Sequence, residues 1–389
     1  MGRHYGMDWL RIGAFGLLIF YHIGLVFVHW GYHAKTAHPM EWVAVPLQAI
    51  NAWRLPLLFV VSGYASRAIF AGDRRPADFA WGRTKRLIVP LLFGVIVIVP
   101  SQPWIELSTQ HGYTASFLHF WFSDYFRFGK LSGISLPTWQ HLWFVGYLWF
   151  YTMLLAAGIA ITPSAVRAWI ADMADRALAG PLILIIPMAL LIANWSYAFP
   201  GSPETHGFFD DWQVHRVYFP MLLFGFLLRG GDRVWRAIRR WWWVGGILAV
   251  ASYAFIADVE IRHMGSPVPT RAIWYWFGVA RAVQCWGAIV ALIGIADRWL
   301  NHDHAVRPML NEAVFPFYMI HQTIIVVVAG ALLAFGLSPI IEFGIILAAT
   351  VAGCWAFYRI GREIGWLRPL IGLRARKAGH TPAHSPRSA

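Results

Sequence analysis

Long apolar segments follow one another along this chain, separated by stretches that are richer in charged residues, Gly and Pro. About 20 residues of α-helix span the 30 Å hydrocarbon core of a bilayer, and most of the segments are close to that length. The pattern therefore predicts an all-α, polytopic integral membrane protein. We expect about ten transmembrane helices, at residues 9–30, 42–68, 87–104, 140–162, 181–199, 214–229, 241–257, 272–296, 313–335 and 339–358.

Two parts of the chain depart from this pattern. The connection from Ile105 to Trp139 is the longest; it contains the aromatic run FLHFWFSDYFRF, and we expect a short interfacial helix there. From about Arg368 the chain is polar and poor in large apolar residues, which is typical of disorder. We therefore expect one transmembrane domain over residues 1–365 and a disordered, basic cytoplasmic tail over residues 366–389.

Composition and charge support a membrane protein and give it an orientation. Hydrophobic residues make up 58% of the 389 residues, and the net charge is +13. With the N-terminus inside, about 23 Lys and Arg fall on the cytoplasmic side and about six on the other, as the positive-inside rule requires. This predicts cytoplasmic termini and a location in the cytoplasmic (inner) membrane, and it explains the charge without nucleic acid. Cys285 and Cys354 lie in apolar segments, so the sequence indicates neither disulfides nor a thiolate metal site.

A polar stripe runs along the first predicted helix. Asp8, Arg11, His22 and His29 recur at spacings that place them on one helical face. Ionisable side chains in lipid cost several kcal/mol, about 3 for Arg on insertion scales, so this face is expected to look into the protein. Arg11 lies near the cytoplasmic surface and His22 about 16 Å above it, as a reaction that crosses the membrane would need. The alternative is an interfacial Asp8–Arg11 ion pair, with His22 hydrogen-bonded to a neighbouring helix.

Further polar groups lie at membrane depth. Arg54 is near the middle of the second predicted helix, with Pro56 breaking that helix and Gly63 allowing a close backbone approach. A buried Arg without a partner is costly, so Arg54 should meet an acidic, carbonyl or phosphate group. Arg281 is at mid-depth in the eighth predicted helix. We interpret both arginines as substrate-binding residues.

Three more candidates for substrate binding come from the segments FPFYMIHQT and HLWF. Tyr318 and His321 share a face within the ninth predicted helix, and His141 begins the fourth at the outer surface. Interfacial anchoring or packing is the alternative for Tyr318 and His141.

A basic cluster follows the second predicted helix on the cytoplasmic side. Arginine presents a planar fork of donors that matches phosphate, so Arg67, Arg83 and Arg86 are candidates for binding the phosphates of a nucleotide-containing donor. Ordinary topology and contact with anionic lipid are the alternative for most of this cluster, which also contains Arg74, Arg75 and Lys85. The sequence has no HExxH or GxxxxGK[ST] motif, so no metal is predicted.

Five short segments occur in order along the chain: Asp8-Trp9-Leu10-Arg11 followed by His22, PLLFVVSGY at 56–64, GRTKRLIVP at 82–90, HLWF at 141–144 and FYMIHQT at 317–323. In these residues the chain resembles the integral-membrane acyltransferases of the acyltransferase-3 family, which includes O-acetylases and a glucan-succinylating membrane protein. The resemblance spans nearly all ten predicted helices. The family's usual Tyr-Leu-x-His appears here as Tyr-Met-Ile-His at 318–321.

The resemblance implies an O-acyltransferase that takes an acetyl- or succinyl-type group from cytoplasmic acyl-CoA to a hydroxyl of an extracytoplasmic acceptor, with carbohydrate the expected class. It implies that His22 acts on the acceptor or carries the acyl group, and that Arg11, beside Asp8, holds the donor or orders His22. Acyl-CoA is then a co-substrate, with no tightly bound cofactor, and a partner protein could complete the transfer. The alternative function is a secondary transporter or flippase that uses the buried His and Arg as a relay.

Overall fold

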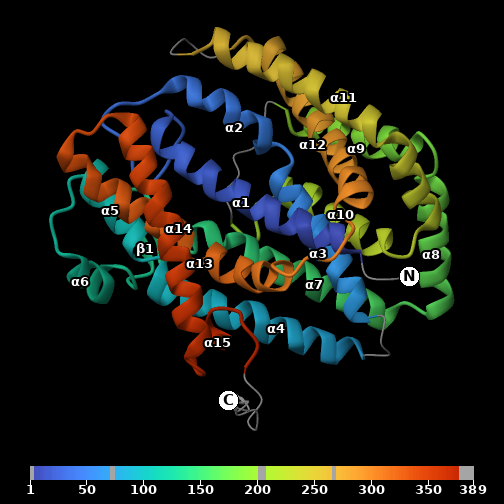
Figure 1. Cartoon of the computed structure of the whole chain (residues 1–389), viewed down its shortest axis with the longest axis horizontal. Helices are drawn as coiled ribbons and strands as arrows, with labels where there is room; N and C mark the ends of the chain where they lie inside the picture. The colour runs from blue at the N-terminus through green and yellow to red at the C-terminus, as the bar shows by residue number, and fades with distance from the viewer. Residues whose placement is uncertain (1–3, 71–74, 200–206, 265–268, 376–389) are drawn as a thin grey trace, which may run out of the picture.

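A computed structural model describes residues 4–70, 75–199, 207–264 and 269–375, which form a helical bundle (Figure 1). The all-α fold and the polytopic membrane architecture are confirmed. The helices are α1 (Tyr5–Phe27), α2 (Ala44–Asn51), α3 (Arg54–Phe70), α4 (Pro76–Phe93), α5 (Ser101–Gln110), α6 (Phe117–His119), α7 (Trp143–Ile161), α8 (Ser164–Ala177), α9 (Leu182–Ala198), α10 (Trp212–Leu228), α11 (Asp232–Arg262), α12 (Arg271–Trp299), α13 (Arg307–Leu332), α14 (Pro339–Glu363) and α15 (Leu367–Leu370). Short 3-10 or π turns lie at Glu41–Val43, Gly94–Ile98, Phe120–Asp124, Gln140–Leu142 and Leu333–Phe335.

The number of spans is lower than the sequence suggested. Among the described residues, eight helices are long and apolar enough to cross a membrane, or nine if the bent pair α8 and α9 counts as one span. These two helices meet at 99°, because Gly180 and Pro181 separate them. The predicted span at 214–229 is α10, whose 17 residues extend about 25 Å, less than the hydrocarbon core.

The break in the second span lies where the proline predicts it. Helix α2 ends at Asn51 and α3 begins at Arg54, because the ring of Pro56 has no N–H to donate to the carbonyl four residues earlier. Irregular backbone at membrane depth is tolerated where it lines a cavity. Asn51, Ala52 and residues 54–56 do line one, as described below.

Three other segments differ from expectation. Helix α4 starts at Pro76, so Arg83, Lys85 and Arg86 lie on a helix rather than in a loop. The long connection holds a hairpin, β1 (Gly129–Leu131) antiparallel to β2 (Ile134–Leu136), after the short helix α6. Residues 366–375 of the expected disordered tail are ordered, since they include α15 and the buried side chains of Ile371 and Leu373. Residues 376–389, like Arg74, lie outside the described residues.

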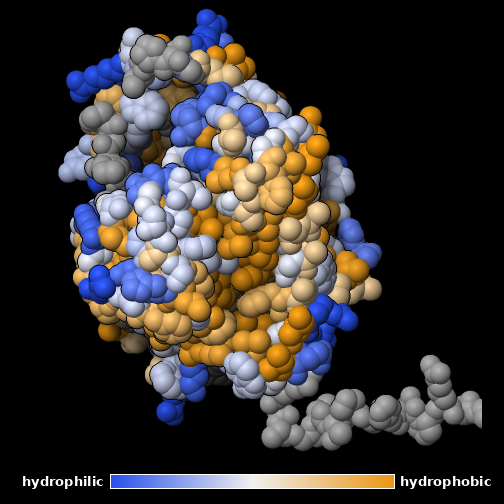
Figure 2. All heavy atoms as spheres, turned by 90° about the vertical axis from the view of Figure 1, so that its left-hand side faces the viewer, coloured by the Kyte–Doolittle hydropathy of each residue, from blue (hydrophilic) through white to orange (hydrophobic). Residues whose placement is uncertain are grey.

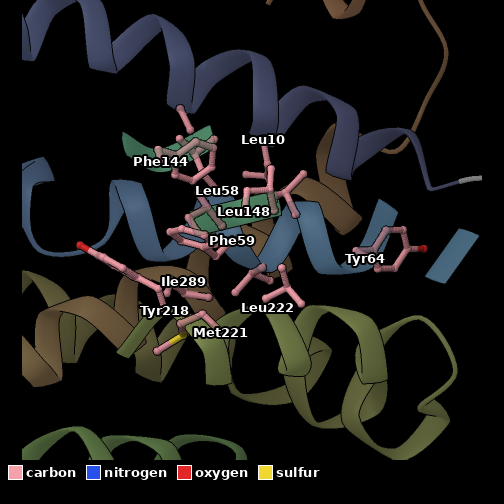
Figure 3. Packing of buried hydrophobic residues seen from close by; sticks show 14 of the residues in the cluster. Leu10, Leu58, Phe59, Tyr64, Phe144, Leu148, Tyr218, Met221, Leu222 and Ile289 are labelled. Atoms are coloured by element: carbon pink, nitrogen blue, oxygen red, sulfur yellow. The ribbon is translucent and has the colours of Figure 1, made fainter. Parts of the chain in front are cut away.

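The main core lies between α1, α3, α7, α10 and α12. Leu10, Phe59, Phe144, Leu222 and Ile289 come from these five helices and pack together (Figure 3). At the end of the bundle that carries α6 and the hairpin, a broad hydrophobic area runs through the middle of the face, and hydrophilic residues gather mainly toward its edges (Figure 2).

Helices α3 and α10 pack backbone to backbone, as expected for Gly63. A Cβ at Gly63 would lie 1.9 Å from the carbonyl oxygen of Leu222, and one at Gly225 would lie 1.9 Å from that of Val60. Gly63→Ala must separate the helices, and we expect a cost of about 3 kcal/mol, seen as a lower melting temperature in detergent. Gly13→Ala is the matched control, because no neighbouring atom lies within 4 Å of that position. Equal melting temperatures for the two variants would contradict the packing.

Candidate active site

A cavity of about 630 Å³ opens at the end of the bundle where α1 ends and α7, α10 and α12 begin. Its walls include His22 and Tyr32 from α1 and the following loop, Arg54 from α3 and Arg281 from α12. None of the described residues in its walls is an Asp or a Glu. The cavity is therefore positively charged on balance and suits a polar or anionic ligand.

His22 stands in the wall of this cavity and pairs with His321 of α13. Nδ1 of His22 is 2.8 Å from Nε2 of His321, and the ring centroids are 5.0 Å apart. Tyr32 stacks nearly parallel to His22, with centroids 6.2 Å apart. His22 is half-buried, whereas His321 has no exposed surface. The structure thus places His321 behind His22, away from any ligand in the large cavity.

The C-terminal end of α1 is held by Lys35, which folds back over the helix terminus. Its Nζ donates to the carbonyl oxygens of Leu25 and Val28, each at 2.8 Å, and to that of Trp30. These bonds satisfy carbonyl groups that a helix end leaves without partners. Burial lowers the pKa of Lys35 to about 8. The helix ends at Phe27, so His29 does not continue the stripe; it is exposed and pairs with Glu41.

Two of the predicted substrate-binding residues have their polar atoms committed within the protein. Nε2 of His141 donates to the carbonyl oxygen of Met319 at 3.1 Å, and its Nδ1 accepts from Gln102 at 3.4 Å. The hydroxyl of Tyr318 donates to the carbonyl oxygen of His141. Both residues line the cavity. Because their polar atoms are already hydrogen-bonded within the protein, these side chains pack and anchor the helices rather than donate to a ligand.

Arg54 and Arg281 are differently placed. Arg54 is only 5% exposed; it donates to Oδ1 of Asn51 at 3.1 Å and lies over the ring of Tyr21, while its Nε has no partner among the described residues. Arg281 is close enough to Arg54 to feel its charge. Among the described residues, Arg281 has neither a hydrogen bond nor an ion pair. The expectation that Arg54 meets a carbonyl group is confirmed for the amide oxygen of Asn51.

At the opposite end of α1, Asp8 and Arg11 bind α13. Arg307 donates to Asp8 at 2.6 Å, and Nη2 of Arg11 donates to Oδ1 of Asn311 at 2.6 Å. Arg11 lies about 16 Å along the helix from His22, so it does not touch the same atoms of a small ligand.

The expected phosphate-binding arginines do not form one group. Arg83 is close enough to Arg86 and Arg11 to feel both charges, and none of the described carboxylates forms an ion pair with Arg83 or Arg86. Arg67 instead has Arg167 and Arg229 as charged neighbours and lies over the ring of Phe226. Arg83 and Arg86 therefore form a group with Arg11, at the N-terminal end of α1, that does not include Arg67.

A narrow apolar groove of about 170 Å³ lies beside the large cavity. It runs between α1 and α13 from Ile12, next to Arg11, to His321, and it shares Leu18 and Tyr318 with the walls of the large cavity. The groove is thus an apolar space beside α1 that ends at His321.

Sequence reasoning missed several residues of the site. Tyr32 and Asn51 line the cavity close to His22 and Arg54, and the buried hydroxyl of Tyr32 has no hydrogen-bond partner among the described residues. Asn51 could have been found as a polar residue beside Arg54 at membrane depth. Tyr32 carries no signal, because the loop after α1 gives no indication of where it folds back. No three His, Cys, Asp or Glu side chains among the described residues gather as a metal site would require.

Comparison with known proteins decides the family. The sequence model of a family described as "Acyltransferase domain" matches residues 4–359. The chain belongs to the acyltransferase-3 family. Among curated proteins, it is similar to "Glucans biosynthesis protein C" of Salmonella typhi and of Salmonella typhimurium, at 26% identity over 148 residues in each case. That match covers 37% of this chain and about a third (35%) of each relative. No solved structure matches.

Proposed function

We propose that this acyltransferase-3 protein is an O-acyltransferase that moves an acyl group from cytoplasmic acyl-CoA to a hydroxyl of an extracytoplasmic acceptor. The observation that carries the proposal is the placement of His22, half-buried and paired with His321, in the wall of a cationic cavity at one end of the bundle. At the other end lie Arg83 and Arg86, which form no ion pair with the carboxylates of the described residues. The proposed site is in the cytoplasmic membrane, with the arginine end inside.

The end of the proposed site that holds Arg83 and Arg86 would bind the acyl-CoA donor. CoA carries several phosphates at one end and its thioester at the far end of an extended arm. Arg83 and Arg86, with Arg11 beside them, would bind the phosphates, and the apolar groove along α1 would lead the arm toward His22. Asp8 would help through Arg307, which fixes α1 against α13.

At the outer end, His22 would act as the general base. The imidazole takes the proton of the acceptor hydroxyl as its oxygen attacks the thioester carbonyl carbon. The C–S bond then breaks, and His22 returns the proton to the sulfur of the leaving CoA. Arg54 and Arg281, in the walls of the same cavity, would stabilise the oxyanion or bind the carboxylate of a succinyl group.

Carbohydrate is the acceptor class we propose. The cavity is large and has amide, hydroxyl and aromatic groups in its walls, including Asn51, Tyr32 and Trp143. Such groups bind sugars through hydrogen bonds and stacking. The relatives' name, which refers to the biosynthesis of glucans, points to the same class.

Purified protein in nanodiscs, supplied with labelled acetyl-CoA or succinyl-CoA and an oligosaccharide, should release one free CoA thiol for each ester formed. A secondary transporter would leave the thioester intact, and in proteoliposomes it would carry label across the bilayer. Transport without thiol release would overturn the proposal. The thioester that is consumed faster would identify the acyl group.

A further inference from the structure

The hydrogen bonds of His321 determine which of its nitrogens carries the proton. Nδ1 of His321 lies 2.7 Å from the carbonyl oxygen of Tyr318 and 3.2 Å from that of Phe317. A carbonyl oxygen only accepts, so Nδ1 must be the protonated nitrogen. A neutral imidazole carries one N–H, which leaves Nε2 of His321 as an acceptor.

The protonation of His321 in turn determines which nitrogen of His22 carries the proton. Only one proton fits between Nδ1 of His22 and Nε2 of His321, 2.8 Å apart, and it must come from His22. The second nitrogen of His22, Nε2, is then the one with a free lone pair. Among the described residues, Nε2 of His22 has no hydrogen-bond partner, and His22 lines the cavity. The lone pair is thus on the nitrogen that remains available to a substrate.

We propose that His321 is a positioning residue that holds His22 in the tautomer able to accept a proton from a substrate hydroxyl. The chain from the Tyr318 carbonyl through His321 to His22 fixes both the orientation and the proton of the reacting imidazole. This inference rests on the proposed function, since it assigns a role to His321 in the same reaction.

The groups around the pair fit this role. None of the described carboxylates is within hydrogen-bonding distance of either ring. The nearby ionisable groups are Arg54, His33, His141, Tyr21, Tyr32 and Tyr318. A carbonyl acceptor orients the pair without adding a charge to a buried site, where an unpaired charge is costly. It also cannot be protonated, so it keeps its role across the working pH range.

The test compares two substitutions of His321. Gln offers both a donor for the Tyr318 carbonyl and an oxygen acceptor for Nδ1 of His22, whereas Leu offers neither at similar size. We expect His321→Leu to lower kcat about 100-fold or more, while KM for donor and acceptor stay within about twofold. His321→Gln should recover kcat to within about tenfold of the original protein. Equal losses for the two variants, both folded, would overturn the role.

A second readout does not depend on the reaction. Nitrogen-15 NMR of histidine-labelled protein in nanodiscs, with the His22 signals assigned by their loss in His22→Gln, reports which ring nitrogen bears the proton. We expect protonated Nδ1 in the original protein and in His321→Gln, and a mixture of tautomers in His321→Leu. Protonated Nε2 in the original protein would refute the inference. If no acyl transfer is found but the NMR result holds, the proposed function fails while the tautomer assignment stands.

His215 provides a matched control. It is a histidine between the hydroxyl of Tyr151, at 2.8 Å, and the carbonyl oxygen of Phe208, at 3.0 Å, and it does not line the cavity. His215→Gln should change kcat less than about twofold if it stays folded, which a melting curve checks. A loss as large as that of His321→Leu would show that removing any buried histidine lowers activity, and would contradict the specific role.

Discussion

The His22→Gln variant is expected to bind both substrates and to transfer almost no acyl group, with kcat lower by about 10²- to 10⁴-fold. Gln can keep a hydrogen bond to His321 but cannot take a proton from a hydroxyl near neutral pH. KM for acyl-CoA should change little, because the donor phosphates would bind about 16 Å away along α1. Initial rates of CoA release in nanodiscs measure both constants.

His29→Gln is the control for this variant. Both histidines belong to the predicted stripe, but His29 lies beyond the end of α1, is largely exposed and pairs with Glu41. Its substitution should leave kcat and KM unchanged. If His22→Gln transferred acyl groups at the original rate, the catalytic role of His22 would be wrong. If His29→Gln lost as much activity, the loss would come from a change at the C-terminal end of α1 and not from removal of the general base.

Much of the fold could be predicted because a bilayer imposes simple rules on sequence. A helix that spans the bilayer needs about 20 apolar residues. Within such a helix, glycine indicates a close approach of two backbones and proline indicates a break. The close approach at Gly63 and the break before Pro56 follow from those rules. The bend between α8 and α9 and the shortness of α10 did not, because the sequences of α9 and α10 are as apolar as that of the spanning helix α12.

The site shows where sequence stops being informative. That His22 and Arg54 point into the protein could be predicted, since lipid disfavours both. That His22 meets His321, 299 positions away, could not, because the pairing depends on how α1 packs against α13. The sequence also suggests a single phosphate-binding site that contains Arg67, Arg83 and Arg86. The packing of the helices separates Arg67, beside Arg167 and Arg229, from Arg83 and Arg86.

Because Arg83 and Arg86 lie apart from Arg67, we expect a second large effect, on the KM for the acyl donor. Arg83→Gln is expected to raise KM for acyl-CoA about 10- to 100-fold, since a hydrogen bond to a charged group contributes about 1.5–3 kcal/mol. Nε of Arg83 is buried without a partner among the described residues, so a phosphate would supply an acceptor that the protein lacks. kcat should stay within about threefold, because the chemistry takes place at the other end of α1.

An acyl-pantetheine donor, which lacks the nucleotide phosphates, separates phosphate binding from a general loss of structure. The original protein should prefer acyl-CoA strongly, and Arg83→Gln should reduce that preference while using acyl-pantetheine as well as before. Lys85→Gln is the control, since Lys85 is on the same helix but exposed and lies over the ring of Trp81. If both donors weakened equally in Arg83→Gln, Arg83 would support the fold of α4 rather than bind phosphate. If Lys85→Gln behaved like Arg83→Gln, only the net charge of the inner surface would matter, and its effect would vanish at high salt.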